Sequence, residues 1–179
     1  MSRRGFLGAA SQLGRDNRGT TAIEFALVAM PFLTILFGII AAGLFFFVTF
    51  SMENAVERAS RLIRTGQAQL NGMKTDEFKL RVCEHTPGFV DCANKLRVNV
   101  QRFTTFAGVV NAQCTDTDGN LIPEPAPTNV PGNAGDVILV TVCYEWELAG
   151  YIPFLEVGKM PNGSALIQAA TTFRTEPFQ

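Results

Sequence analysis

Histidine, tyrosine and tryptophan are scarce in this sequence of 179 residues, and charged side chains make up only 17% of it. An ordinary soluble domain has about 25% charged residues. The 15 basic and 16 acidic side chains nearly cancel, which excludes bulk electrostatic attraction to nucleic acid as the main activity. With His85 as the single histidine, the sequence contains no recognisable nucleophile–base pair. It also contains no phosphate- or dinucleotide-binding fingerprint. We therefore expect a non-enzymatic protein without a cofactor.

Charge is absent altogether from Phe25 to Phe50, a run of 26 residues. A bilayer requires about 20 apolar residues, each rising 1.5 Å along a helix. A buried helix of a soluble protein that is this long nearly always carries some polar residue. The run therefore predicts a transmembrane helix over residues 20–50. Pro31 is compatible with this assignment because proline is tolerated inside membrane helices.

Arginine is more frequent before the apolar run than after it. Residues 1–19 contain four arginines and one aspartate, whereas residues 51–64 contain three arginines and two glutamates. The more basic flank of a membrane helix stays in the cytoplasm. The N-terminus is thus expected in the cytoplasm and residues 51–179 outside. A twin-arginine export signal at Arg3-Arg4 is disfavoured, because its apolar segment should follow directly rather than begin at residue 25.

Cysteine is absent from the leader and the apolar run. Four cysteines in an exported domain predict two disulfides, and three pairings are possible. We favour Cys83–Cys92 with Cys114–Cys143, because the first pair closes a short loop and the second joins a loop to a strand. Zinc binding is the alternative. It is disfavoured because the chain has no C-x-x-C motif and only one histidine.

Apolar periodicity in the exported part predicts an α+β domain. Residues 51–66 continue the long helix with one apolar stripe, and a short helix is expected around 76–83. Alternating apolar and polar residues predict strands at 96–101 and 138–147, with a third strand at 164–175. We expect a pilin-like arrangement in which the outer half of the long transmembrane helix packs on this small antiparallel sheet.

A second candidate metal site lies in the proline-rich segment 115–135. Residues 116–120 read DTDGN, which resembles part of a calcium-binding loop. The segment lacks the third spaced acid and the terminal glutamate of such a loop. It is therefore predicted to be a tight turn rather than a metal site.

The junction around Gly19 is the most specific pattern in the chain. Residues 18–32 read RGTTAIEFALVAMPF, so a short basic leader ends in glycine and Glu24 stands at the start of the apolar run. This is the pattern of class III signal peptides, as in type IV pilins and pseudopilins. More narrowly, it resembles the TadE/TadF family, the minor pseudopilins of the tight-adherence (Flp-type, type IVc) pilus system. Residues 170–178 also resemble the usual ending of that family.

The resemblance implies cleavage between Gly19 and Thr20 by a membrane prepilin peptidase. The chain would then comprise a leader (1–19), a transmembrane helix (20–50) and an exported pilin-like domain (51–179). Its implied partners are the prepilin peptidase, other pseudopilins, the major pilin, the pilus assembly platform of the bacterial inner membrane, and membrane lipid. The implied function is initiation or assembly of a pilus used in cell adhesion, with the subunit in the inner membrane or incorporated in the pilus.

Glu24, followed by Phe25, is the candidate residue for assembly or processing. Cleavage creates an ammonium group at Thr20, and a carboxylate of one subunit can neutralise the ammonium of its neighbour. Each charge alone is expensive in a low-dielectric setting, and the pair is much less so. Two alternatives remain open: a permanently anchored single-pass envelope scaffold or sensor, and an exported enzyme tethered by its helix.

Overall fold

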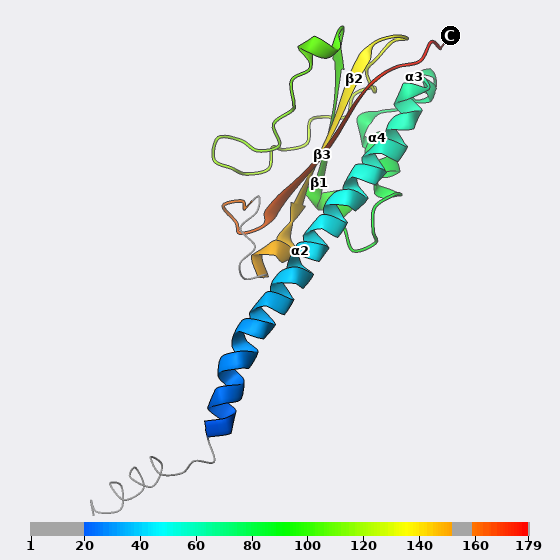
Figure 1. Cartoon of the computed structure of the whole chain (residues 1–179). Coiled ribbons are helices and arrows are strands. Elements are labelled where there is room, and N and C mark those ends of the chain that lie inside the picture. The colour runs from blue at the N-terminus through cyan, green and yellow to red at the C-terminus, as the bar shows by residue number, and fades with distance from the viewer. Residues whose placement is uncertain (1–19, 152–158, 179) are drawn as a thin grey trace, which may run out of the picture. The chain divides into compact units, whose positions relative to one another are not determined.

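The computed structural model describes residues 20–151 and 159–178 (Figure 1). Contacts divide the chain into two units, one ending at Ile40 and one beginning at Ala41, which we call the head unit. Helix α2 (Thr20–Arg64) is shared by both. The remaining elements of the head unit, in chain order, are α3 (Gln67–Leu70), α4 (Thr75–Cys83), α5 (Cys92–Lys95), β1 (Leu96–Phe103), η2 (Phe106–Gly108), β2 (Val137–Trp146), η3 (Glu147–Tyr151) and β3 (Ala165–Arg174).

The head-unit part of α2 buries one face against the sheet (Figure 1). Its apolar residues recur at three- and four-residue spacings, which places them on one side of a helix. Met52, Ala55 and Ile63 are completely buried, and Val48, Val56 and Ala59 nearly so. The stripe predicted for residues 51–66 is thus confirmed, and it is the largest helical contribution to the core.

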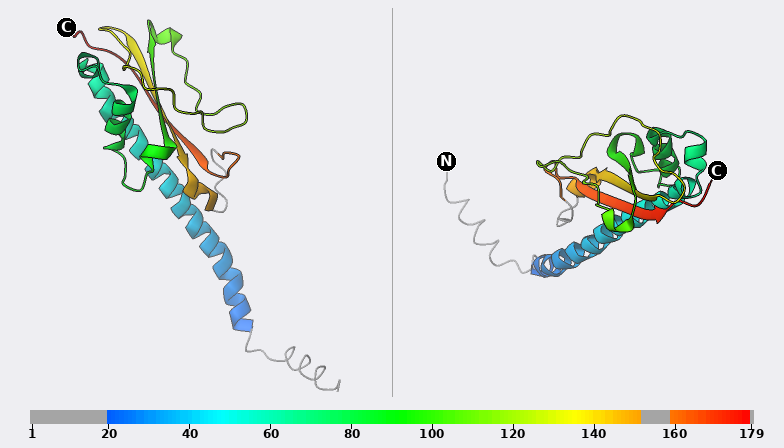
Figure 2. Two further views of the ribbon diagram at one scale, coloured as in Figure 1. Left: turned by 180° about the vertical axis from the view of Figure 1, so that it is seen from behind. Right: turned by 90° about the horizontal axis from the view of Figure 1, so that it is seen from above.

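The sheet is antiparallel and has the strand order β1-β2-β3 (Figure 2). Leu96 of β1 lies opposite Tyr144 of β2, and Val137 at the start of β2 lies opposite Arg174 of β3. The structure therefore confirms the α+β class and the three predicted strands. Alternate side chains of β2 point to α2, and they form the sheet side of the core: Ile138, Val140, Val142, Tyr144 and Trp146.

The central strand departs from the expected pattern of one buried and one polar face, because all ten residues of β2 are buried. Leu139 and Thr141, which point away from α2, are as inaccessible as the core residues. The long loop between β1 and β2 accounts for this burial. A disulfide from Cys114 to Cys143 attaches the loop to β2, and a hydrogen bond from Gln168 Nε2 to the Ala112 carbonyl attaches it to β3. The alternation of apolar and polar residues along one strand does not predict that a loop will cover its outer face.

The same loop is attached to the helical side of the head. Lys79 of α4, a largely buried lysine, donates hydrogen bonds to Glu124 Oε2 at 2.6 Å and to the Ala93 carbonyl at 3.1 Å. The ion pair with Glu124 compensates the ammonium group for lost hydration. The loop therefore joins α4 as well as the sheet.

The C-terminal segment packs on the end of α2. Glu176 N–H donates to the Arg64 carbonyl at 2.8 Å, and the Arg64 guanidinium lies 5.0 Å from the centre of the Phe173 ring. Gly66, which follows the helix, has φ +78° and lies directly against the Phe178 ring. Only glycine combines this left-handed conformation with so close an approach.

Replacement of Gly66 by alanine should therefore destabilise the head more than the same change at Gly72. Gly72 also has a positive φ but open space around it, so Gly72→Ala carries only the left-handed backbone cost of about 1–2 kcal/mol. Gly66→Ala adds a clash with Phe178, worth roughly another 1–3 kcal/mol. Thermal unfolding of the full chain in detergent measures both. Equal losses of stability would contradict the proposed contact.

Candidate membrane and assembly segment

The first unit of the chain, as far as it is described, is a helix with almost no buried surface. Among residues 20–151 and 159–178, α2 is the single helix long and apolar enough to span a membrane, and only 11% of its most apolar 18-residue stretch is buried. Large apolar side chains face outward all around this part of the helix, for example Phe25, Leu27 and Met30, each more than 70% exposed. A helix that is apolar on every side requires an apolar environment. This explains why the structure leaves this segment without a covering layer.

The helix continues through Pro31. Proline has no N–H and therefore leaves the carbonyl of Leu27, four residues earlier, without its usual helical donor. Thr34 Oγ1 donates to the Met30 carbonyl at 2.9 Å and not to that of Leu27. In membrane helices such a freed carbonyl can be satisfied by neighbouring helices, side chains or water.

Glu24 lies within α2, one turn after its first residue, and its side chain is exposed. Its neighbours Ile23 and Phe25 are 64% and 74% exposed. Thr20 and Glu24 stand four residues apart and hence on the same helix face. Gly19 and the leader (1–19) lie outside the described residues. The structure thus presents Glu24 as the only carboxylate on an otherwise apolar surface between Thr20 and Phe50.

Small residues near the unit boundary do not form one contact face. Gly38 and Ala42 are one turn apart, whereas Ala41 is buried in the head unit and Gly43 points elsewhere. Open space surrounds the positions where Gly38 and Gly43 would carry a side chain. Another helix could therefore approach closely at Gly38 or at Gly43, which lie on different sides of α2.

The four cysteines are paired as favoured from the sequence. Cys83 at the end of α4 bonds to Cys92 at the start of α5, and Cys114 in the long loop bonds to Cys143 on β2, with Cα–Cα distances of 5.8 and 5.7 Å. The first bond joins two helices, and the second attaches the long loop to the central strand. Both bonds are structural cross-links within the head unit.

The acidic segment 116–120 is a tight turn, as predicted. Asp116 Oδ1 accepts the backbone N–H groups of Asp118 and Asn120 at 3.0 and 2.8 Å, and Gly119 has φ +82°. The carboxylate thus serves its own backbone. No cluster of three metal-ligating side chains occurs within the described ranges 20–151 and 159–178. His85 lines a groove beside α2 and α4.

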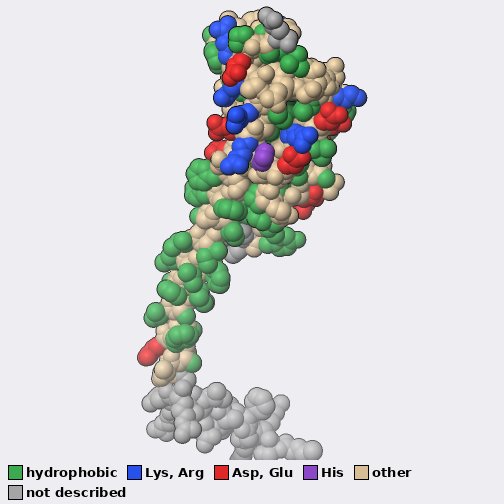
Figure 3. Space-filling view, turned by 90° about the vertical axis from the view of Figure 1, so that its right-hand side faces the viewer, with side chains coloured by type: hydrophobic (Ala, Val, Ile, Leu, Met, Phe, Trp, Pro, Cys, Tyr) green, Lys and Arg blue, Asp and Glu red, His purple; other side chains and the backbone are tan. Residues whose placement is uncertain are grey.

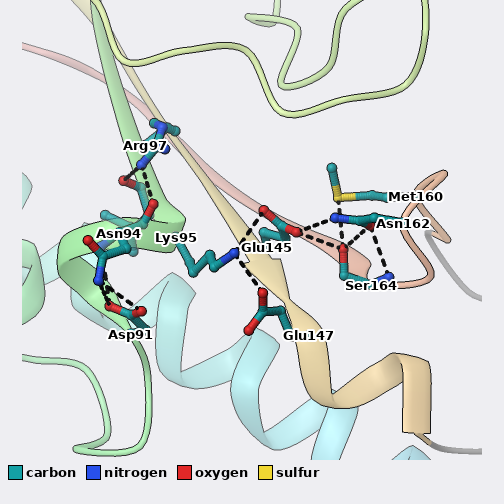
Figure 4. A network of polar contacts seen from close by, with 10 residues as sticks. Asp91, Asn94, Lys95, Arg97, Glu145, Glu147, Met160, Asn162 and Ser164 are labelled. Atoms are coloured by element: carbon teal, nitrogen blue, oxygen red, sulfur yellow. Dashed lines mark hydrogen bonds and ion pairs between the residues drawn. The ribbon is translucent and has the colours of Figure 1, made fainter.

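A polar network lies where β2 ends (Figure 4). Lys95 approaches Glu147 at 2.6 Å and Glu145 at 3.8 Å. Glu145, which is 8% exposed, also accepts hydrogen bonds from Asn162 and Ser164. The hydrogen bond to Glu147 raises the pKa of Lys95, so this cation persists over the physiological pH range.

Asp91 flanks this network and caps α5. Its carboxylate accepts from the side chain and backbone of Asn94, which lowers the pKa of Asp91. The network holds the segment before β3 against β2. Lys95 is shared by two carboxylates, and Asn162 and Ser164 donate further hydrogen bonds to Glu145. Sequence analysis missed the network, because its members lie in three separate segments of the chain, around residues 91–95, 145–147 and 162–164, and no local spacing connects them.

Charged side chains otherwise gather on the head, whereas the long helix carries apolar ones (Figure 3). A groove of about 350 Å³ on the head is lined by Arg58, Arg61, Arg64, Glu57 and Glu176. Its charges are of both signs and it is open to solvent. It has neither a nucleophile nor a metal-binding set, so α2 and its N-terminal junction are the strongest functional candidate.

Comparison with known families supports this choice. Residues 19–61 match the family model described as TadE-like protein. The TadE-like match begins at Gly19, one residue before α2, and ends three residues before the helix does. The resemblance seen at the junction is thus confirmed over this segment, and it indicates a protein associated with the tight-adherence pilus. No curated protein and no solved structure matches the chain significantly.

The two disulfides should differ in their contribution to stability. They bridge 29 and 9 residues of sequence. Loop-closure entropy predicts about 3–4 kcal/mol for Cys114–Cys143 and about 2–3 kcal/mol for Cys83–Cys92. The double replacement Cys114→Ser/Cys143→Ser should therefore lower the midpoint of thermal unfolding more than Cys83→Ser/Cys92→Ser. Peptide mapping without reduction checks the pairing itself; crossed pairs or four free thiols would refute it.

Proposed function

We propose that this chain is a non-enzymatic minor pseudopilin that takes part in initiation and assembly of a tight-adherence pilus. A prepilin peptidase removes residues 1–19, and the mature chain begins at Thr20. Residues 20–50 anchor it in the bacterial inner membrane with its leader in the cytoplasm, and residues 51–179 lie in the periplasm. Its partners are the other pseudopilins, the major pilin and the assembly platform in the membrane.

One observation carries this proposal: the family match begins at the residue where the basic leader ends. The leader ends at Gly19, and the TadE-like match covers residues 19–61. The match therefore includes the residue before the proposed cleavage site, Glu24 and the apolar run, but none of the residues before Gly19. An ordinary membrane anchor has no reason for a family match to begin where its basic flank ends.

Glu24 has a physical role at this junction. Cleavage would place an ammonium group at the first residue of α2, at the positive end of the helix dipole. That position is unfavourable for a cation, and the adjoining surface is apolar. A carboxylate one turn away can neutralise the ammonium of its own chain, and in a helix bundle it can neutralise that of a neighbour. The intermolecular pair would define the axial register between subunits, whereas the intramolecular pair would not.

A permanently anchored envelope scaffold or sensor is the second candidate. It is supported by the exposed helix and by the head, which would be exported in either case. The two candidates differ in processing, since a scaffold retains its leader. Sequencing the N-terminus of the mature protein decides between them: Thr20 supports the pseudopilin and Met1 supports the scaffold.

Replacement of Gly19 by leucine should leave the chain uncut. Prepilin cleavage next to a membrane favours a residue without a side chain before the scissile bond, because the backbone must approach the peptidase closely. Gly14→Leu, the same change inside the leader, is the matched control and should be processed normally. The intact mass of each purified chain measures the outcome. A mature chain beginning at Thr20 in Gly19→Leu would refute the assigned cleavage site.

Replacement of Glu24 by glutamine should preserve cleavage and insertion but impair association with pilin-like partners. The side chain keeps its size and loses its charge, so a neighbour's ammonium remains unpaired in a low-dielectric setting, at a cost of a few kcal/mol. Glu24→Asp should be intermediate, because the charge is kept and the reach is shorter by one methylene. Co-purification with other pilus components and a count of assembled pili measure the effect.

Glu53→Gln is the matched control, since Glu53 is the first acidic residue after the apolar run and is also exposed. It should leave assembly unchanged. Normal association and a normal number of pili in Glu24→Gln would refute the pair between subunits. Glu24 would then pair only with the ammonium group of its own chain, or would only mark the edge of the membrane helix. A failure of cleavage would instead assign Glu24 to recognition by the peptidase.

A further inference from the structure

We propose that the head unit is seated directly on the membrane surface, with an apolar rim at the base of the head inserted among the lipid headgroups. The rim comprises six exposed side chains around the point where α2 enters the head: Phe46, Phe47, Phe50, Phe89, Leu148 and Tyr151. This inference rests on the membrane anchorage in the proposed function and adds a second contact with the same lipid.

The length of the apolar run leaves no spacer between membrane and head. The head unit begins at Ala41, whereas the uncharged run extends from Phe25 to Phe50. Residues 25–40 cover about 24 Å along a helix, less than the roughly 30 Å of a bilayer hydrocarbon core. A spanning helix must therefore use about four more residues, to Leu44. A tilted helix would need still more residues.

Residues of α2 just beyond Leu44 already belong to the base of the head. The Phe45 ring lies 6.0 Å from that of Trp146, and the Phe47 ring lies 6.2 Å from that of Phe89. Phe47 is three residues past Leu44, or about 4.5 Å along the helix axis. Phe47 would therefore lie in the headgroup region, which extends several ångströms beyond the hydrocarbon core on each side.

The exposed side chains at the level of Phe47 are apolar or aromatic, which suits the headgroup region of a membrane. Phe89 is 56% exposed, Leu148 is 55% and Tyr151 is 85%. They come from two different parts of the chain. Phe89 contacts Phe47 of α2, and η3 directly follows Trp146, whose ring lies beside that of Phe45. Tyrosine is enriched at membrane–water interfaces, and Tyr151 is the exposed tyrosine here, whereas Tyr144 and Trp146 are buried in the core.

The charges beside the rim favour neutral lipid over an electrostatic attachment. Glu147 is next to Leu148 in sequence and is paired with Lys95. Asp91 and Glu145 are held by their own hydrogen bonds. No uncompensated cluster of cations lies among these described neighbours of the rim. The attachment should therefore depend on apolar area and occur on phosphatidylcholine without anionic lipid.

Lipid is the occupant because the rim is continuous with the surface that the membrane must cover. Phe46, Phe47 and Phe50 belong both to the rim and to the 26-residue uncharged run. A second protein chain would have to exclude lipid from the helix and from the rim at the same time.

Tryptophan reporters in the full-length chain test the proposal. Phe89→Trp reports on the rim and Phe106→Trp is the matched control, because Phe89 and Phe106 are 56% and 57% exposed. Phe106 follows the far end of β1, about 23 Å from the end near the rim at 3.3 Å per residue. Phe37→Trp within the helix reports on insertion. Each variant also carries Trp146→Phe, which removes the fluorescence of the native tryptophan. If Trp146→Phe prevents folding, Trp146 is kept and its emission in the unmodified protein is subtracted from that of each variant.

The variants are reconstituted in phosphatidylcholine vesicles in which brominated lipid replaces ordinary lipid stepwise. Phe37→Trp and Phe89→Trp should both lose fluorescence intensity, and Phe89→Trp should emit at shorter wavelength than Phe106→Trp. Phe106→Trp should keep its intensity throughout. Leu148→Trp should behave as Phe89→Trp does.

Quenching at Phe37→Trp without quenching at Phe89→Trp would overturn the seated head and leave the membrane anchor intact. A blue-shifted but unquenched Phe89→Trp would mean that another protein chain covers the rim, which also overturns the proposal. Absence of quenching at both positions would overturn the anchor and the seated head together.

Discussion

The burial of one face of α2 in the head is the interaction on which the rest of the structure depends. A single helix of 45 residues passes from a segment exposed on all sides to a segment with Met52, Ala55 and Ile63 fully buried. Within residues 20–151 and 159–178 this three-stranded sheet has no second sheet against it, so its inner face requires the helix. Sheet and helix are thus stable only together, as expected where a small sheet buries one face.

The second constraint is the closure of the other face of the sheet. Every residue of β2 is buried, and a long, proline-rich loop covers the side away from α2. Its position is fixed by covalent and ionic attachments, the Cys114–Cys143 disulfide and the Lys79–Glu124 ion pair, and by the buried Val130. Two different physical mechanisms, apolar packing on one face and cross-linking on the other, therefore complete a core from three strands.

These constraints separate the functional parts of the molecule. Glu24 lies in the part of α2 that contributes no described residue to the core, so its substitution should leave the head folded. The rim lies where α2 first becomes buried. Under the proposed arrangement, residues Ala41–Phe50 contact both the head and the lipid: Val48 is buried in the head, while Phe46, Phe47 and Phe50 face outward.

The sequence by itself determined the features that depend on residues close together in the chain. The uncharged run predicts the helix because length and hydropathy alone decide membrane compatibility. The Gly19–Glu24 junction is a local motif, which the TadE-like match covers. Alternation predicts the three strands, and the stripe from Ala55 to Ile63 predicts the buried face of α2. Loop length was sufficient to favour the cysteine pairing that the structure contains.

Only the tertiary structure decided which distant residues meet. The approach of Phe178 to Gly66, the Lys95–Glu145–Glu147 network and the two-sided burial of β2 join segments tens of residues apart. The rim has the same origin, since Phe47 and Phe89 are 42 positions apart and become neighbours only when α2 packs on the head. Periodicity reports which face of an element is apolar. It does not report which element covers that face, because this depends on the closure of long loops.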